Sequence, residues 1–158
     1  MNIGLISDTH GLLRPQALAA LQSCDHIIHA GDIGKPEILA ALRQLAPLTA
    51  VYGNIDRDQD WARHLLKIEI VKLEGLTLLV THERKDVPEP LPHGVQMVVT
   101  GHSHKPCILE DNGVLYINPG SAGPRRFKLP ISMGYVTCAA GKVNGELIDL
   151  APDTSVVA

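Results

Sequence analysis

The chain has 158 residues, of which 45% are hydrophobic and 20% charged, proportions typical of one soluble globular domain. Its formal net charge is −3 and it has no long basic run, so it lacks the electrostatic footprint of a general nucleic-acid-binding protein. No apolar stretch approaches the roughly 20 residues of a membrane-spanning helix, so we expect no membrane partner.

The N-terminus and the cysteines indicate a cellular compartment. The chain reaches Asp8 and His10 too early for a secretory signal peptide to precede them. Cys24, Cys107 and Cys138 are far apart and form no C-x-x-C pair. We therefore expect buried free thiols, neither a disulfide framework nor a thiolate zinc site, in a cytoplasmic protein.

Short apolar runs recur along the chain, each ended by small or polar residues. Six of them predict buried strands, at Ile3–Ile6, Ile27–His29, Leu48–Tyr52, Leu76–Val80, Val95–Val99 and Val114–Ile117. Two helical patterns separate the first three runs. One covers residues 13–22 with Pro15 near its start, where proline is tolerated, and the other is Pro36–Arg43. The first half therefore alternates strand and helix, as α/β proteins do.

The second half predicts antiparallel hairpins. Their turns are Glu74-Gly75, Asn112-Gly113 and the residues around Gly141, between pairs of apolar runs. We predict an α/β fold of two mixed β-sheets packed face to face and flanked by helices, in a single domain over residues 1–158. We expect the tail after Pro152 to fray.

Metal-ligand side chains follow five of the predicted strands, mostly beside a glycine. They are Asp8 and His10, then Asp32, then Asn54 and Asp56, then His82, and finally His102 and His104. Strand ends on one edge of a sheet converge, and ligands of open α/β sheets bind there. Mixed imidazole and carboxylate ligands suit divalent ions such as zinc, iron or manganese. Each fragment alone is common, but all five at strand ends predict a metal site.

In this order the motifs resemble those of the calcineurin-like metallophosphoesterases, especially the small bacterial and archaeal phosphodiesterase group. The pattern D-x-H, G-D, G-N-x-D, a lone His after a strand, and G-H-x-H runs from Asp8 to His104. Asn118-Pro119-Gly120-Ser121 then matches the N-P-G-S of the small group. The resemblance covers nearly the whole chain. It implies an enzyme with the four-layer sandwich of that family, and homo-oligomers are common in the group.

The resemblance also implies a role for each matching residue. One divalent metal would be held by Asp8, His10, Asp32 and His104. A second would be held by Asp32, Asn54, His82 and His102, with Asp32 as the bridge. A hydroxide between the metals would attack phosphorus in line, with Asp32, Asn54 and His82 as catalytic residues. We expect a phosphodiesterase for small phosphoesters that uses Mn²⁺, with Zn²⁺, Fe²⁺, Ni²⁺ or Co²⁺ as alternatives.

Two departures from the family pattern concern the leaving group and the substrate. Larger members read G-N-H-[DE], where the histidine is thought to protonate the leaving group; here the position is Ile55, so this loop supplies no general acid. Small members often continue H-G-H, whereas this chain reads His82-Glu83-Arg84. The stretch 86–92 holds three prolines and cannot be a regular helix, so we expect a loop bordering the site.

Several roles stay open between function and ordinary structure. Asp56 either orients a ligand or caps a helix, and Asn118 either supports the ligand loops or serves its turn. Arg84 and the pair Arg125-Arg126 either bind phosphate or are solvated. We expect His29 to be a packed residue or a support behind the ligands.

A non-catalytic protein-interaction module on the same fold is the alternative function, as in the vacuolar sorting proteins that resemble this family. Those relatives tend to lose metal ligands, whereas this chain keeps all seven. The natural substrate and the metal used in the cell stay open.

Overall fold

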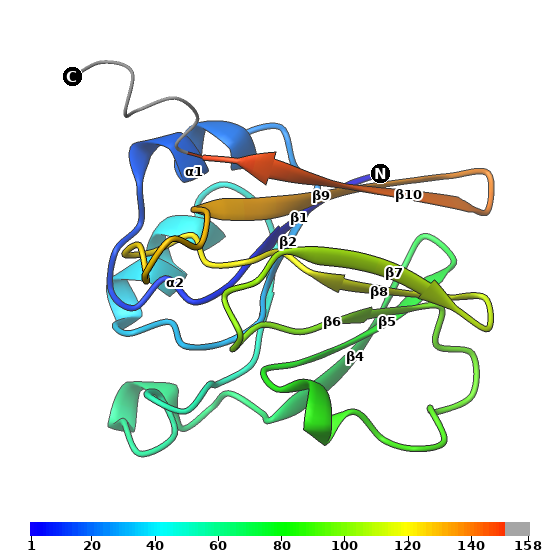
Figure 1. The fold of residues 1–158 in the computed structure, drawn as a ribbon, viewed down its shortest axis with the longest axis horizontal. Coiled ribbons are helices and arrows are strands. Elements are labelled where there is room, and N and C mark those ends of the chain that lie inside the picture. The colour runs from blue at the N-terminus through cyan, green and yellow to red at the C-terminus, as the bar shows by residue number, and fades with distance from the viewer. Residues whose placement is uncertain (151–158) are drawn as a thin grey trace.

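The computed structural model describes residues 1–150, so the predicted fraying after Pro152 lies outside the described residues. Two mixed five-stranded sheets lie one above the other, which confirms the predicted fold class (Figure 1). The first sheet has the order β10 (Lys142–Asp149), β9 (Ser132–Ala139), β1 (Asn2–Ile6), β2 (His26–His29), β3 (Leu48–Ala50). The second has the order β4 (Ile68–Leu73), β5 (Leu76–Thr81), β6 (Met97–Val99), β8 (Val114–Asn118), β7 (Cys107–Asp111).

Two helices pack on the outer face of the first sheet. Both α1 (Pro15–Leu21) and α2 (Pro36–Arg43) begin on a proline, whose fixed φ suits the first helical turn. The apolar side chains of each helix recur at helical spacing and enter one core cluster with the sheet. The buried residues of α2 are Ile38, Leu39 and Leu42.

The core between the sheets is almost entirely aliphatic, because aromatic residues make up only 3% of the chain. Fully buried residues from both sheets meet there, among them Ile3, Leu5, Ile28, Leu78, Val80, Met97 and Val99. Burying one such side chain stabilises the fold by about 1.5–3 kcal/mol. This shared core holds the two sheets, and therefore the loops at their ends, in one fixed arrangement.

An irregular segment covers the outer face of the second sheet. It begins with a short 3-10 helix, η2 (Arg84–Asp86), and continues through the three prolines. Val87 and Leu91 pack against an apolar cluster on that face of the sheet. The predicted loop is therefore present, but most of it covers the sheet, and its start at Asp86 lies beside the predicted ligand His82.

The other local predictions have mixed outcomes. The three predicted hairpins are confirmed as the antiparallel pairs β4–β5, β7–β8 and β9–β10.

Cys24 and Cys138 are buried as expected. The prediction is wrong for Cys107, which is exposed because every residue of the edge strand β7 faces solvent. Within residues 1–150, no helix has the length and apolar character that crossing a membrane requires.

The carboxyl ends of five strands come together at one end of the molecule. Strands β1, β2 and β3 are parallel, as are β5 and β6, so their following loops lie on the same side of each sheet. The Asp8 N–H donates to the Gly31 carbonyl at 3.0 Å, and the Gly101 N–H donates to the His82 carbonyl at 2.9 Å. These bonds tie the ligand-bearing loops together in pairs.

Candidate metal centre

Five of the seven predicted ligands have a left-handed backbone conformation, with φ between 47° and 72°. They are Asp8, His10, Asp32, His102 and His104. This conformation costs a non-glycine residue on the order of 1 kcal/mol, and it persists only where surrounding contacts enforce it. The strand-end loops therefore turn sharply at the residues that carry the ligand side chains.

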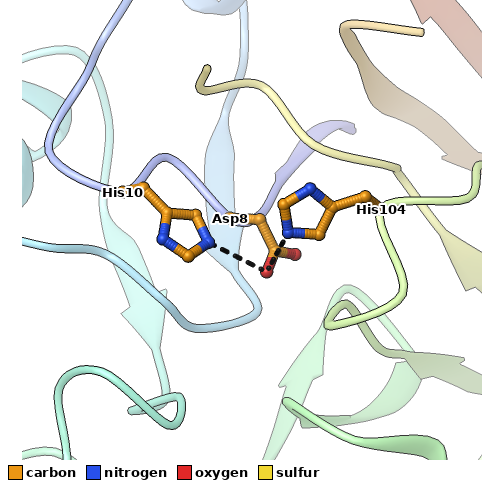
Figure 2. A group of neighbouring side chains, drawn as sticks. All are labelled: Asp8, His10 and His104. Carbon is orange, nitrogen blue, oxygen red and sulfur yellow. Dashed lines mark ion pairs between the residues drawn. The ribbon is translucent and has the colours of Figure 1, made fainter. Parts of the chain in front are cut away.

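Asp8, His10 and His104 form a first cluster, which we call the Asp8 group (Figure 2). The Oδ1 atom of Asp8 lies 3.3 Å from Nε2 of His104 and 3.7 Å from Nε2 of His10. Asp8 and His10 follow β1, whereas His104 follows β6, so the group joins the two sheets. One ligand atom from each side chain lies within 4.8 Å of the others, a spacing that allows one cation to contact all three.

Asp32, His82 and His102 form a second cluster, the Asp32 group. The Oδ2 atom of Asp32 lies 3.3 Å from Nε2 of His82 and 3.5 Å from Nε2 of His10. The Asp32 carboxylate thus lies between a histidine of each group. His82 donates from Nδ1 to the Ala30 carbonyl at 2.8 Å, which leaves its Nε2 lone pair directed at the carboxylates.

Asn54 lies at the edge of the Asp32 group. It is exposed, on the turn after β3, and lines the same small pocket as His82 and Glu83. Burial acts to raise the pKa of Glu83, but a hydrogen bond from Asn54, with Lys85 and His102 nearby, holds that pKa below its usual value. The next residue, Ile55, is 43% exposed, so an apolar side chain occupies the position discussed above for a proton donor.

Several buried polar atoms of the ligand residues have no hydrogen-bond partner. Among the residues that the structure describes, these atoms are Asp8 Oδ1, His10 Nε2, His82 Nε2 and His104 Nδ1. An unsatisfied buried polar atom costs about 1–3 kcal/mol, so it calls for a bound ion or ligand. Two of them, His10 Nε2 and His82 Nε2, face a third, Asp8 Oδ1, at 3.7 and 3.9 Å, whereas His104 directs Nε2 and not Nδ1 at Asp8. These three facing atoms are of the carboxylate and imidazole types that bind divalent transition metals, so the residues present fit a cation.

Both carboxylates are held in the ionised form that a cation requires. Burial acts to raise the pKa of Asp8, but the adjacent His10, His104 and His82 and the Ser7 hydroxyl hold that pKa well below its usual range. Burial also opposes ionisation of Asp32, yet His82 and the Ile55 N–H lower its pKa. Burial acts to lower the pKa of His82, and the two carboxylates raise it instead. Protons therefore compete with a cation for this site.

Two serines hold Asp8 in place. The Ser7 hydroxyl donates to Asp8 Oδ2 at 2.6 Å, and the His102 N–H donates to the same atom at 3.0 Å. The Ser121 hydroxyl donates to the Asp8 carbonyl at 3.0 Å. Gly101 is required beside them, because a Cβ there would lie 2.7 Å from Asp8 Oδ2. Ser121 belongs to the N-P-G-S motif, whereas no sequence signal distinguishes Ser7 from an ordinary loop serine.

Asp56 positions the ligand loops; it does not cap a helix. Its fully buried carboxylate accepts backbone N–H groups from Ile33 at 3.0 Å, Gly34 at 3.0 Å and Gly53 at 2.9 Å. The first two belong to the loop of Asp32 and the third to the loop of Asn54. Asp56 therefore joins the two loops that carry the predicted ligands of the second metal.

Asn118 has both of the roles that the sequence left open. Its Oδ1 accepts the Gly120 N–H at 2.9 Å, which closes its own turn. Its Nδ2 donates to the Gly101 carbonyl at 3.0 Å and to the Ser103 hydroxyl at 3.1 Å. The amide therefore also supports the loop that carries His102 and His104.

His29 links the loops behind both groups. It is fully buried, and its Nδ1 accepts the Gly31 N–H at 3.1 Å. Its Nε2 lies 3.0 Å from the Thr9 hydroxyl, which itself donates to the Ile33 carbonyl at 2.8 Å, so Nε2 is the donor. Burial lowers the pKa of His29 to about 4, which keeps the ring neutral and in this tautomer.

The three arginines left open have different surroundings. The Arg84 guanidinium stacks 4.1 Å from the ring centroid of Tyr116, so it is not simply solvated. Arg84 lines a pocket of about 260 Å³ that also contains Ser103. Arg126 lines a second, open hollow that also contains Ser103. Arg125 donates to a carbonyl of its own turn.

The chain is similar to known proteins over most of its length. Residues 1–141 match the model of the calcineurin-like phosphoesterase superfamily domain. The chain is 34% identical to a "probable metallophosphoesterase" of Methanothermobacter thermautotrophicus, over 94% of this chain and 90% of the relative.

Two solved structures share the fold. One is described as a novel archaeal phosphodiesterase, with a TM-score of 0.76 and 24% identity over 94% of this chain and 100% of that one. The other is Vps29 of Entamoeba histolytica complexed with Zn²⁺, with a TM-score of 0.69 and 23% identity over 95% and 99% of the two chains. One fold therefore carries differently named proteins, and the residues of the site distinguish between functions.

Proposed function

This chain belongs to the calcineurin-like phosphoesterase superfamily and is a metallophosphoesterase, and we propose that it is a phosphodiesterase with two divalent cations in the site described above. The observation that carries the proposal is the position of Asp32 Oδ2, 3.5 Å from His10 of one group and 3.3 Å from His82 of the other. A carboxylate in that position offsets the repulsion between two cations about 3.5–4 Å apart.

We assign Asp8, His10, Asp32 and His104 to the first cation. We assign Asp32, Asn54, His82 and His102 to the second. When bound, the cations lower the pKa of a water nucleophile and stabilise charge on the phosphoryl oxygens. Only two of the seven ligands are anionic, so the filled site keeps a positive charge that attracts a phosphate ester.

The chain's own residues then orient the reaction. His82 is fixed through its bond to the Ala30 carbonyl, and Asp32 is fixed through the Ile55 N–H at 3.1 Å, so neither ligand must reorganise during turnover. The Ile55 side chain carries no proton for the leaving group, which favours esters whose leaving groups are stable anions. Imidazole and carboxylate ligands suit Mn²⁺, which we propose as the first metal to test. The name of the similar archaeal phosphodiesterase supports a diester over a monoester.

The test is a chromogenic assay with purified protein and Mn²⁺. We expect faster hydrolysis of bis(p-nitrophenyl) phosphate, a diester, than of p-nitrophenyl phosphate, a monoester. Asp32→Ala removes the shared ligand and should lower kcat/KM by at least about 10³-fold. As a control, Asp58→Ala changes an exposed carboxylate in the turn after β3 and should leave kcat/KM unchanged. A wild type that binds two cations per chain yet hydrolyses neither ester would contradict the proposal.

A further inference from the structure

The only phenylalanine of the chain, Phe127, lies almost entirely in solvent. It is 88% exposed, more than any other large apolar side chain in the part of the chain that the structure describes. An exposed aromatic ring gains nothing for folding, because its apolar surface stays in water. In a chain with only 3% aromatic residues, this placement points to a ligand contact.

The turn that carries Phe127 holds the ring outward. Phe127 has a φ of 54°, a left-handed conformation that is unfavourable for a bulky side chain. The Leu129 N–H donates to the Arg126 carbonyl at 3.1 Å, and Arg125 Nη1 donates to the Leu129 carbonyl at 3.4 Å. These bonds close the turn around Phe127, so the ring is presented on a defined backbone.

Cationic side chains surround the ring. An open hollow of about 870 Å³ is lined by Ser103, Lys105, Arg126, Phe127, Lys128 and Leu129. Three of these residues are cationic and none is acidic. Within residues 1–150, no ion pair involves Lys105, Arg126 or Lys128. The hollow therefore combines an aromatic surface with unneutralised positive charge.

Two chain segments form the hollow, and each of them is connected to a loop of the candidate metal centre. Ser103 stands between His102 and His104 in the sequence. The segment that leads into the turn begins at Ser121, whose hydroxyl donates to the Asp8 carbonyl. Farther along it, Arg14 holds the Gly123 carbonyl with two N–H groups at 3.2 and 3.3 Å. Both walls of the hollow are thus anchored to loops that carry the Asp8 group.

We propose that this hollow is a substrate subsite for an ester arm that carries both a flat aromatic ring and a second anionic group, as a nucleoside bisphosphate does. The ring stacks on Phe127, and the second anion pairs with Lys105, Arg126 and Lys128. The proposal rests on the proposed phosphodiesterase function and names the class of substrate that the site prefers.

A small ligand fits these features better than a membrane surface. Membrane-binding loops insert several apolar side chains, whereas this turn exposes a single ring, and its cations line a hollow beside the metal ligands. Paired cations and a stacking face in one hollow match a ligand of nucleotide size.

The test uses three diesters with the same p-nitrophenolate leaving group on metal-loaded protein. They are methyl p-nitrophenyl phosphate, thymidine 5′-(p-nitrophenyl phosphate), and the latter with an added 3′-phosphate. Phe127→Ala should raise the ratio of KM for the thymidine ester to KM for the methyl ester about 10-fold, and Phe127→Tyr should restore it, because base stacking needs the ring. Lys128→Ala should raise KM for the 3′-phosphorylated ester about fivefold relative to the unphosphorylated one.

Matched controls are Ile70→Ala, an exposed apolar residue of β4, and Lys142→Ala, an exposed lysine at the start of β10; both should leave these ratios unchanged. A Phe127→Ala ratio within twofold of wild type would overturn the subsite. So would weaker binding of Phe127→Ala to phosphatidylserine vesicles with no change in the thymidine ratio, since that result identifies a membrane contact.

Calorimetry of thymidine 3′,5′-bisphosphate binding separates this proposal from the proposed function. If no ester is hydrolysed but Phe127→Ala weakens binding of the bisphosphate about 10-fold, the subsite stands and the phosphodiesterase function fails. If the esters are hydrolysed but the bisphosphate binds wild type and Phe127→Ala equally, the function stands and the subsite fails.

Discussion

The Asp8 group and the Asp32 group contain the same chemistry, one carboxylate and two histidines, but they meet solvent differently. The side chains of Asp8 and His104 are 0% and 3% exposed, whereas that of His102 is 50% exposed, and Asn54 beside it is exposed too. Asp8 is also held by Ser7, the His102 N–H and Ser121.

This difference indicates that the two groups, although similar in chemistry, differ in cation affinity and in access for substrate. A buried and braced group loses little conformational freedom when it binds a cation, so it should bind tightly and hold its geometry. An open group binds more weakly but leaves room for a substrate oxygen to approach. We therefore expect the Asp8 group to fill first as a cation is added.

The strongest test of this difference in affinity removes one histidine from each group. His104→Ala should weaken the tighter binding step for Mn²⁺ by more than about 100-fold, because loss of even a supporting residue costs metal sites 10–100-fold. His102→Ala should weaken only the looser step. Isothermal titration of Mn²⁺ into each variant and into an exposed-histidine control, His93→Asn, measures both steps. Equal weakening of both steps by both variants would show that the groups do not bind separately.

Acidification should lower the free energy of unfolding through His29, which links the loops behind both groups. Its folded pKa is about 4, against an ordinary value of 6.5, so below pH 6.5 the unfolded chain takes up a proton that the folded chain does not. The free energy of unfolding should therefore fall as pH drops from 6.5 toward 4, by up to about 3 kcal/mol.

Urea unfolding of metal-free protein between about pH 4.5 and 6.5 measures this slope, and His29→Asn should reduce it while His93→Asn retains it. The raised pKa of His82 acts at higher pH and with the opposite sign, since its contribution is lost as pH rises above 6.5. The lowered pKa values of Asp8 and Asp32 act below the window, because their contribution is lost only as pH falls below 3.8. An unchanged slope in His29→Asn would show that another group titrates.

The smallest expected effect concerns Glu83, which flanks only the Asp32 group. Its Oε1 lies 3.9 Å from His102 Nδ1, and a hydrogen bond joins its side chain to that of Asn54. Glu83→Gln removes a negative charge near the second cation and should weaken the looser Mn²⁺ step about fivefold, as expected for one partly screened charge. Titration of the variant beside the exposed control Glu89→Gln measures it. An equal effect on the tighter step would mean that the charge acts on the whole site.

The sequence by itself determined most of the local structure and the identity of the candidate ligands. Prolines at helix starts, the Asn112-Gly113 turn and period-free apolar runs act through neighbouring residues, so they can be recognised in a linear pattern. The ligand types follow strand ends for the same reason, because the chain turns where an apolar run stops. The exposed Cys107 was predicted wrongly, since an apolar run does not reveal whether its strand lies at a sheet edge.

Only the tertiary structure decided which ligands share a group and what surrounds them. His104 contacts Asp8, 96 positions earlier in the numbering, because two sheets pack face to face through one aliphatic core. The same packing makes Asp56 a support for two loops, and it brings the turn of Phe127 into one hollow with Ser103 and Lys105, which flank His104 in the sequence. Sequence patterns record local geometry, whereas the distance between two loops depends on how whole sheets pack, and that is set by the entire core.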